Sequence, residues 1–412
     1  MGEPPGSTDG SPTAPDVDPT ETVTGTETTG TTDTTDTTDT TDTTEGLPQT
    51  CDRLYDPDTV TELSMSFTPE DWRELRADCD AGRQDYHPVE LGFEDETIAA
   101  MVRLKGNWSW SCDKLQFVVS FNEEEPGGRF RGLRKLVLDA PWYDQTLLHE
   151  RIAFGQFARR GLPYSCANSA RLAINGQYYG AYTNVERIDE EYLERHFVDS
   201  SGNLYQGGSE LKTNEEIGDT SRRDALFAAR SVDEIASLMD LDQAVAEWSV
   251  EAMLPALDNY WAGSEINYYL YDDPTRGFVY LPYDLDISFG DSAYTDGSLI
   301  WPDALNADPI VYEHGGWGKE DLFKRVLSDE AWCRRFVEEL RLTAESYDPT
   351  ELQAQVDAWG EQIAEAVEED DLKPFSDADH RRSVEDLRAF FGERRQVVDR
   401  WLAAGDPCPA RW

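Results

Sequence analysis

Residues 267–290 read NYYLYDDPTRGFVYLPYDLDISFG. Two aromatic-rich runs, 267–271 and 278–281, have the composition of β-strands. The proline and the glycine between these runs are typical of a tight turn. The pattern predicts an antiparallel hairpin in which Asn267 lies opposite Pro282.

Two acidic residues follow this hairpin: Asp284 and Asp286 alternate with a leucine and an isoleucine. If the chain stays extended, its period of two places both carboxylates on one face and both aliphatic side chains on the other. The amide of Asn267 then lies close to both carboxylates. Such oxygen ligands suit a hard cation, Mg²⁺ or Mn²⁺. Without a cation the two carboxylates would repel each other, or one would hold its proton.

The polar residues around the hairpin follow the order of a protein kinase metal site. In kinases a catalytic Asp precedes an Asn, a hairpin follows, and a metal-binding Asp stands before Phe-Gly. Here Asp258 precedes Asn267 by nine residues, a longer spacing than in kinases, and the acidic pair precedes Phe289 and Gly290. The His-Arg-Asp and Asp-Phe-Gly motifs do not occur, so the order by itself does not identify a kinase.

Strand and helix patterns divide the rest of the chain into two halves. Strands are expected at 98–105, 114–121, 133–138, 170–174 and 178–183, and Asn175-Gly176 between the last two is typical of a type I′ turn. Helices are expected at 147–160, 242–257, 320–346, 351–369 and 380–403. The pattern predicts an α+β fold with a β-rich N-terminal half and a helical C-terminal half.

Residues 1–50 have a different composition. They contain eleven Asp and Glu, nineteen Thr, no Lys or Arg and no aromatic residue, with a Thr-Thr-Asp repeat between Thr31 and Glu45. A segment with so little apolar surface to bury cannot offset its ordering entropy. We expect a disordered acidic linker at 1–50 and a folded domain at 51–412.

The charge balance excludes several classes of partner. The chain has 83 Asp and Glu against 36 Lys and Arg, a formal net charge of -47. Nucleic-acid binding requires a basic face, so it is not expected, and anionic membrane surfaces are disfavoured for the same reason. No apolar run approaches the roughly 20 residues of a membrane span. We expect no transmembrane segment, and a monomer is the simplest expectation.

The six cysteines are widely spaced and form no CxxC or CxH pattern, which disfavours zinc. Their even number, behind a Thr/Asp-rich linker, predicts an oxidising compartment and up to three disulfides with about 15 possible pairings. The alternative is six free thiols in a cytosolic protein. An oxidising compartment would make the protein extracellular or attached to the cell surface. The chain does not begin with a signal peptide, which would be explained if a leader is removed from the precursor. We also expect a lipid anchor on that precursor, as in bacterial lipoproteins.

Several motifs in this order resemble those of the spore-coat CotH kinase-like proteins over residues 60–290. They are RLKGNWS at 103–109, Lys114, KLVLD at 135–139, DQTLLHER at 144–151, INGQYYGAY at 174–182, Glu186, NYYLY at 267–271 and LPYDLDISFG at 281–290. The resemblance implies an atypical two-lobed kinase fold with a β-rich N-terminal lobe at 51–186 and a helical C-terminal lobe at 187–412. The helices after residue 320 lie outside it and are expected to form a substrate-docking platform or a structural cap.

The resemblance also implies that the protein binds ATP. Lys114, as a strand lysine, would hold the phosphates, with Lys105 as a second candidate. Glu186 would contact the nucleotide, and Arg151 would neutralise a carboxylate or a phosphate. The family's second lysine, two residues after Lys114, is replaced here by Gln116. The structural alternatives are a surface lysine at 114 and a buried ion-pair partner at 151.

In the same resemblance Asp258 would orient the attacking hydroxyl or accept its proton, while Asn267, Asp284 and Asp286 would bind Mg²⁺ or Mn²⁺. The implied activity is transfer of the ATP γ-phosphate to Ser or Thr of a Ser/Thr-rich surface or coat protein. Structural alternatives are a helix cap at 258–259 and a calcium site at the acidic pair. The functional alternatives are a non-catalytic surface or adhesion module that keeps the fold, and a glycoside hydrolase with paired carboxylates.

Overall fold

The hairpin expected from the aromatic runs is present in the computed structural model. Strand β10 (Tyr268–Asp273) pairs antiparallel with β11 (Gly277–Pro282). Tyr268 lies opposite Pro282, so the predicted register is wrong by one residue. Asn267 therefore lies just before β10, where the strand does not dictate the direction of its side chain.

Seven strands close into a barrel in the order β1-β2-β3-β4-β5-β7-β6. Neighbouring strands are antiparallel except β1 and β6, which are parallel. The strands are β1 (Thr61–Ser66), β2 (His87–Phe93), β3 (Glu96–Leu104), β4 (Phe117–Ser120), β5 (Lys135–Asp139), β6 (Ala167–Ile174) and β7 (Gln177–Val185). The predicted strands all appear, but β1 and β2 have no counterpart among them.

The sequence correctly predicts the turn between β6 and β7 but places the start of β4 too early. Asn175 and Gly176 have φ values of 51° and 76°, the positive angles that the predicted type I′ turn requires. Strand β4 begins at Phe117, three residues after Lys114, so Lys114 is not a strand residue. The expected strand at 114–121 is therefore shorter than predicted.

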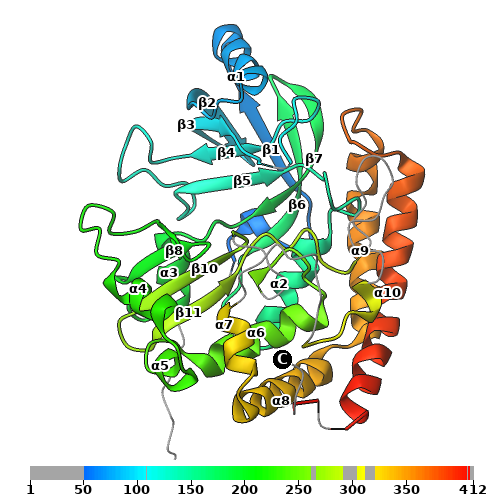
Figure 1. The fold of residues 1–412 in the computed structure, drawn as a ribbon. Helices are drawn as coiled ribbons and strands as arrows, with labels where there is room; N and C mark the ends of the chain where they lie inside the picture. The colour runs from blue at the N-terminus through cyan, green and yellow to red at the C-terminus, as the bar shows by residue number, and fades with distance from the viewer. Residues whose placement is uncertain are drawn as a thin grey trace, which may run out of the picture. The chain divides into compact units, whose positions relative to one another are not determined.

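A second sheet has the order β11-β10-β8-β9, with β8 (Asn203–Gln206) and β9 (Glu210–Leu211). The helices lie mainly in the C-terminal half (Figure 1). They are η1 (Arg53–Tyr55), α1 (Pro69–Ala81), α2 (His149–Arg159), α3 (Glu190–His196), α4 (Ser221–Ala228), α5 (Val232–Ala236), α6 (Leu241–Met253), η3 (Ala304–Asn306), α7 (Asp321–Leu327), α8 (Glu330–Ser346), α9 (Pro349–Glu368) and α10 (Asp377–Ala403). The single helix predicted at 320–346 is two helices, because Asp329 caps α8 by accepting a hydrogen bond from the Ala331 amide at 2.9 Å.

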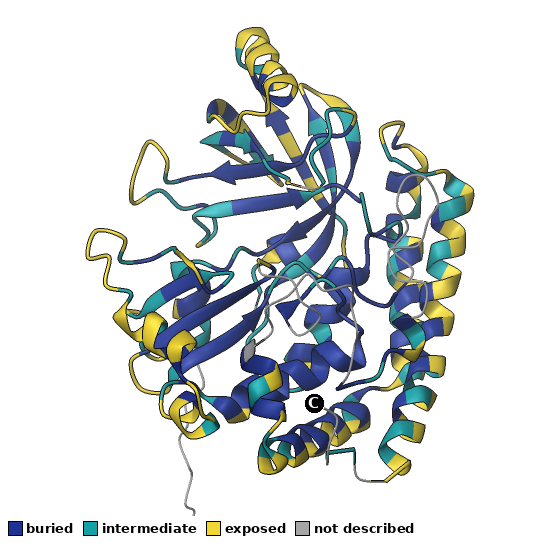
Figure 2. Cartoon of the chain, in the orientation of Figure 1, coloured by how far each residue is buried: buried dark blue, intermediate teal, exposed yellow. Residues whose placement is uncertain are grey.

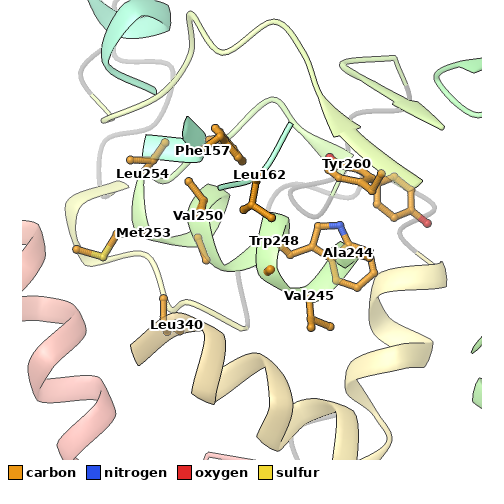
Figure 3. Packing of buried hydrophobic residues seen from close by; sticks show 14 of the residues in the cluster. Phe157, Leu162, Ala244, Val245, Trp248, Val250, Met253, Leu254, Tyr260 and Leu340 are labelled. Carbon is orange, nitrogen blue, oxygen red and sulfur yellow. The ribbon is translucent and has the colours of Figure 1, made fainter. Parts of the chain in front are cut away.

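Helix α6 lies in the largest apolar core. Trp248 is 1% exposed, and its ring meets those of Tyr280 and Phe323 edge-on, with centroids 6.0 and 5.1 Å apart. Figure 3 shows Trp248 among side chains of α6, with Leu340 of α8 below them. Burying each large apolar side chain contributes about 1.5–3 kcal/mol. Strands β10 and β11 and helix α6 are almost wholly buried (Figure 2), so the second sheet has a rigid support.

Helices α9 and α10 lie side by side (Figure 1). Helix α9 packs against β7 of the barrel, and α10 packs against α6 and α8. The Arg394 guanidinium of α10 donates to the carbonyl of Ala252 at 2.6 Å and to that of Met253 at 3.3 Å, at the end of α6. The helix pair therefore joins the barrel to the helical core.

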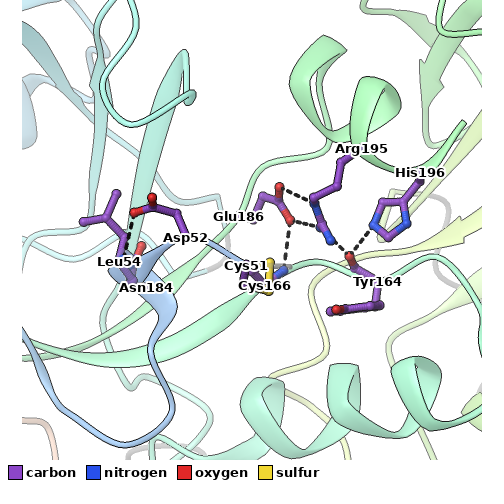
Figure 4. The surroundings of a disulfide bond; sticks show 9 residues. All are labelled: Cys51, Asp52, Leu54, Tyr164, Cys166, Asn184, Glu186, Arg195 and His196. Carbon is purple, nitrogen blue, oxygen red and sulfur yellow. Dashed lines mark hydrogen bonds and ion pairs between the residues drawn. A yellow bond between two sulfur atoms is a disulfide. The ribbon is translucent and has the colours of Figure 1, made fainter. Parts of the chain in front are cut away.

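All six cysteines form disulfides: Cys51–Cys166, Cys79–Cys112 and Cys333–Cys408. The alternative of six free thiols is therefore wrong. The first bridge ties the segment before the barrel to the residue before β6 (Figure 4). The third ties α8 to the segment that follows α10.

The structure describes residues 51–107, 109–260, 266–290, 304–310, 321–405 and 407–408. Gly46–Trp412 form one compact unit, and the linker predicted at 1–50 lies outside the described residues. The described residues have the mixed α+β fold that the sequence predicts. None of the helices among them is both long enough and apolar enough to cross a membrane.

Candidate functional site

Two loops that follow α6 and β11 run beside each other. The Leu257 amide donates to the carbonyl of Ile287 at 3.1 Å, and the Phe289 amide donates to that of Leu254 at 2.8 Å. This backbone pairing brings residues after the helix next to residues after the hairpin. Burial and the charges of Asp284 and Asp139 raise the pKa of Asp286 most. Asp258 also lies close enough for its negative charge to raise that pKa further.

Asp258 and Asn267 are in direct contact. The Asn267 amide nitrogen Nδ2 donates to Asp258 Oδ2 at 2.8 Å, and Asn267 is buried. Because the nitrogen is used in this bond, the amide oxygen of Asn267 is left for another partner. The structure thus brings together the residues predicted as catalytic base and metal ligand, although their roles stay predictions.

Asp284 does not continue the extended chain. Its φ is 59°, in the left-handed region, so the predicted extended backbone after Pro282 is wrong. The alternation of burial is nevertheless present: Leu285 and Ile287 are buried, whereas Asp284 and Asp286 are half-buried. The two carboxylates therefore lie on the less buried side of the loop.

Burial and like charge both act on these carboxylates. Burial raises the pKa of Asp284 to about 6, although Lys105 opposes this shift, and Asp139 adds to it. Burial also raises the pKa of Asp286 well above its usual value, and the charges of Asp284 and Asp139 raise it further. The two groups thus belong to one electrostatic cluster in which negative charge is in excess.

Two members of this cluster have no counterpart among the predicted site residues. Asp139 ends β5, and Glu150 lies in the first turn of α2 with 4% of its surface exposed. Burial raises the pKa of Glu150 well above its usual value, followed by the charges of Asp139 and Asp286. We call Asp139, Glu150, Asp284 and Asp286 the acidic cluster. Both missed residues belong to motifs already visible in the sequence, because Asp139 ends KLVLD and Glu150 is the last residue but one of DQTLLHER.

The start of α2 is held against the loop after β11. The His149 ring nitrogen Nδ1 lies 2.6 Å from the carbonyl oxygen of Asp286, and the His149 amide donates to Asp144 Oδ2 at 2.8 Å. These bonds place the first turn of α2 beside Asp286, which explains why Glu150 belongs to the cluster. Among the described residues, the side-chain oxygens of Glu150, Asp284 and Asp286 have no hydrogen-bond or ion-pair partner.

Lys105 is the cation of this cluster. It follows β3 and forms an ion pair with Asp139 at the end of β5. Strands β3 and β5 are both antiparallel to β4, so their carboxyl ends lie at the same edge of the barrel. Burial by itself lowers the pKa of Lys105, but the charges of Asp139 and Asp284 outweigh it and the pKa is raised.

Lys114, the first candidate for the phosphate-binding lysine, is placed elsewhere. It is fully buried, forms an ion pair with Asp370 just beyond α9, and lies 4.5 Å from the ring centroid of Tyr182. Burial lowers its pKa to about 8, although the charge of Asp370 opposes the shift. Lys114 is 0% exposed, and none of the carboxylates that shift its pKa belongs to the acidic cluster. Lys105 lies within that cluster, so it becomes the leading candidate for the phosphate-binding lysine. The alternative of a surface lysine is also wrong.

Arg151 has a structural role. Its guanidinium donates to Ser169 Oγ at 3.0 Å and to Gln362 Oε1 at 3.1 Å, and it stacks 4.1 Å from the ring centroid of Trp359. Burial lowers the pKa of Arg151 to about 9. Among the described residues Arg151 has neutral acceptors in place of the expected carboxylate partner, and its predicted contact with a phosphate stays a prediction.

Glu186 lies beside the disulfide of Cys51 and Cys166 (Figure 4). Its carboxylate pairs with Arg195 and accepts a hydrogen bond from the Cys166 amide at 2.9 Å. Burial raises the pKa of Glu186, although Arg195 opposes the shift. Both oxygens are used by these partners, so the predicted nucleotide contact of Glu186 is not supported.

The turn at 106–109 follows Lys105, and Trp108 lies outside the described residues. Gln116 holds this turn: its amide nitrogen donates to Ser109 Oγ at 3.0 Å, and its amide oxygen accepts from the Ala140 amide at 3.2 Å. Gln116 therefore holds the loop between the ends of β3 and β5.

The donors at the site are those of a hard cation. In the part of the chain that the structure describes, no group of three His, Cys, Asp or Glu side chains is arranged to hold a metal ion. However, Lys105 interacts with three carboxylates of the acidic cluster, Asp139, Asp284 and Glu150, and the raised pKa values of Glu150 and Asp286 reflect burial and an excess of negative charge. A divalent cation would offset that excess, and carboxylate oxygens are ligands of Mg²⁺ and Mn²⁺, but the metal site stays a prediction.

A family model, a curated protein and a solved structure match this chain. A family model described as CotH kinase protein matches residues 102–398. Inner spore coat protein H of Bacillus subtilis (strain 168) is 25% identical over 251 residues, which are 54% of this chain and 67% of that protein. The crystal structure of the Helicobacter pylori proinflammatory kinase CtkA aligns with a TM-score of 0.36 and 11% identity over 77% of this chain and 90% of that chain.

The family match begins at 102 and reaches into α10, so the helices after residue 320 are not outside the resemblance as expected. It covers well over half of the chain and includes the acidic cluster, Asp258 and Asn267. The chain belongs to the CotH kinase protein family.

Proposed function

We propose that this chain is an ATP-dependent protein kinase that transfers the γ-phosphate to Ser or Thr of a Ser/Thr-rich surface or coat protein. The observation that carries the proposal is the acidic cluster around Lys105, with Asp258 and Asn267 beside it. Phosphoryl transfer needs a cation for the phosphates, metal-binding carboxylates and a group that orients the hydroxyl. The family of the chain supports the same reaction class.

Lys105 is the proposed phosphate contact. Its ion pair with Asp139 holds the ammonium group at the edge of the barrel, next to Asp284. A lysine acts on a phosphate as a point charge, so its position matters more than its orientation. Lys105 therefore binds and orients the nucleotide, while Lys114 supports the fold.

Asp258 is the proposed partner of the attacking hydroxyl. The hydrogen bond from Asn267 Nδ2 holds the Asp258 carboxylate in place, and in this proposal that carboxylate orients the hydroxyl. We assign Asn267 Oδ1, Asp284 and Asp286 to the cation. When bound, Mg²⁺ or Mn²⁺ would neutralise charge on the phosphates. Binding of that cation would also remove the repulsion within the acidic cluster.

The cluster draws on two parts of the chain, which supports the two-lobed organisation at 51–186 and 187–412. Lys105, Asp139 and Glu150 come from the barrel and from α2, whereas Asp284 and Asp286 follow the second sheet. We further propose a surface or coat location. Three disulfides fit an oxidising compartment, and the Bacillus subtilis relative is a spore coat protein by name.

Nucleotide binding can be tested by thermal unfolding with Mn²⁺, with a non-hydrolysable ATP analogue, and with both together. A kinase is stabilised by the pair, by about 2.7 kcal/mol at a hundredfold excess over Kd. Asp284→Ala should lose this gain, while Asp80→Asn, at an exposed carboxylate on α1, should keep it. If the pair does not stabilise the wild type, the protein is the non-catalytic surface module instead.

Phosphoryl transfer needs a separate measurement. Mass spectrometry after incubation with ATP and Mn²⁺ should detect phosphorylated Ser or Thr in an added Ser/Thr-rich acceptor protein, and Asp258→Ala should abolish the signal. The threonines at 31–44 of the chain itself are a second acceptor to inspect. A wild type that binds the nucleotide but modifies no acceptor would contradict the kinase proposal.

A further inference from the structure

Helix α6 carries two acidic residues that the proposed reaction does not use. Glu247 and Glu251 lie four residues apart, so they project from the same face of the helix, and both are 0% exposed. Neither forms an ion pair within the described residues. A buried carboxyl without a cation costs free energy that a leucine of similar size would not. Core packing therefore does not explain why carboxyl groups occupy these two positions.

Glu251 is bonded to the loop that carries Asp258. Its Oε1 accepts a hydrogen bond from Asn259 Nδ2 at 2.9 Å and another from the Tyr280 hydroxyl at 2.9 Å. The same Asn259 Nδ2 lies 3.4 Å from the carbonyl oxygen of Asn267. Asn259 therefore links Glu251 to the backbone of Asn267.

The contacts form a chain of three buried groups. Glu251 holds Asn259, Asn259 reaches the backbone of Asn267, and the side chain of Asn267 donates to Asp258 at 2.8 Å. Glu251, Asn259 and Asn267 are each at most 5% exposed. Water therefore cannot replace these bonds at little cost, and their geometry is passed on to Asp258.

Glu247 has a different set of contacts, although it lies only one turn away. Its Oε1 accepts from Gln243 Nε2 at 2.7 Å, and Gln243 bonds to the backbone of Tyr280 in β11. No bond joins Glu247 to Asn259 within the described residues. The helix thus supplies two buried carboxyls one turn apart. Glu247 is bonded toward the sheet through Gln243. Glu251 is bonded both to Tyr280 of the sheet and to Asn259 of the site loop.

We propose that Glu251 is a positioning residue for the catalytic and metal-binding pair Asp258 and Asn267. It acts through Asn259, and this inference rests on the proposed function. Residues that orient the groups at a metal site typically change metal affinity by about 10- to 100-fold when they are removed. Glu251 never touches the substrate, so its effect is on the direction of the Asn267 amide and the Asp258 carboxylate.

The test measures binding of Mn²⁺ with the non-hydrolysable ATP analogue by electron paramagnetic resonance, which separates bound from free Mn²⁺. Glu251→Leu should weaken Mn²⁺ binding by about 10- to 100-fold. Glu251→Gln keeps an oxygen acceptor for Asn259 and Tyr280, so it should bind Mn²⁺ within about twofold of the wild type. Glu247→Leu makes the same change one turn away and should leave Mn²⁺ affinity unchanged.

Four outcomes are informative. Equal loss in Glu251→Leu and Glu247→Leu would mean that only packing was disturbed, which overturns the proposal. Unchanged affinity in Glu251→Leu also overturns it. If Glu251→Leu does not fold, Asn259→Ala takes its place, because it cuts the same link, and should lose affinity in the same way. If the wild type itself binds no Mn²⁺ with the analogue, the proposed function fails first and this inference fails with it.

Discussion

Lys114, which is buried, and Lys105, which is half-buried just after β3, differ in how their charge is balanced. Lys114 pairs with one carboxylate, Asp370, and both groups are at most 1% exposed. Lys105 faces Asp139, Asp284 and Glu150 together. Burial lowers the pKa of Lys114 to about 8, whereas the surrounding carboxylates raise the pKa of Lys105 in spite of burial. Burial alone therefore does not mark a functional lysine, and the imbalance of charge around it does.

Removal of the partner of Lys114 should have the largest effect on stability. Asp370→Ala leaves a buried ammonium group unpaired, so the free energy of unfolding should fall by about 3–5 kcal/mol. The carboxylate also accepts hydrogen bonds from the Ala181 and Leu372 amides, at 3.0 and 2.9 Å. Urea denaturation checks this.

The double variant Lys114→Met with Asp370→Ala is the control for this first prediction. It should recover part of the lost stability, because no buried charge remains. A loss below about 1 kcal/mol in Asp370→Ala would mean that Lys114 is not a matched buried charge.

Removal of one carboxylate from the acidic cluster should raise the free energy of unfolding, whereas removal of Asp370 lowers it. Without divalent cations, Asp286→Asn removes one of several like charges and should raise the free energy of unfolding by about 1 kcal/mol. With Mn²⁺ and the ATP analogue, the wild type should gain stability and the variant should not. If Asp286→Asn is less stable than the wild type in the absence of divalent cations, the acidic cluster does not carry an unfavourable excess of negative charge.

Glu251 provides a third arrangement, in which the proton itself neutralises the buried acid. Burial raises the pKa of Glu251 from 4.5 to about 8. Between these values the folded chain binds more protons than the unfolded chain, so this contribution to stability is lost as pH rises. Chemical denaturation of Glu251→Gln and wild type should give similar stabilities near pH 4.5 and a gap in favour of the variant that widens toward pH 8.

The raised pKa of Glu247 acts in the same direction and remains in the Glu251→Gln variant. The slope of stability against pH should therefore decrease without vanishing. A gap between wild type and variant that is constant from pH 5 to pH 8 would contradict the raised pKa of Glu251.

The smallest effect is expected at the surface. Arg159 pairs with Glu351 of α9, and their side chains are 27% and 51% exposed. Exposed ion pairs contribute about 0–1 kcal/mol, because water screens them and both side chains lose freedom. Arg159→Ala should therefore change the free energy of unfolding by less than about 1 kcal/mol in urea denaturation. A larger loss of stability would mean that the ion pair of Arg159 and Glu351 contributes like the buried pair of Lys114 and Asp370 rather than like an exposed ion pair.

The sequence predicts well what depends on neighbours along the chain. The hairpin of β10 and β11, the turn at Asn175 and the long C-terminal helices follow from local periodicity and turn residues. The order of Asp258 and Asn267 is visible in the sequence, but the sequence does not predict their direct contact. The even cysteine count correctly predicts three disulfides.

What the sequence does not predict depends on distant segments. Lys114 and Asp370 are 256 residues apart, and no periodicity connects them. Asp139 and Glu150 join the site only because β3 and β5 end at one edge of a closed barrel. The backbone of Asp284 leaves the extended conformation because the loop pairs with residues after α6, which local pattern cannot reveal.

The parallel pairing of β1 with β6 has a practical consequence for anyone who shortens this protein. A fragment that starts at residue 102, where the family match begins, would lack β1, β2 and most of β3, which ends at Leu104. The cylinder would then open along β4 and β6 and expose two unprotected strand borders, which favour intermolecular pairing. Truncated preparations should therefore precipitate or associate, and a usable fragment should begin before Cys51 so that its bridge to Cys166 can form.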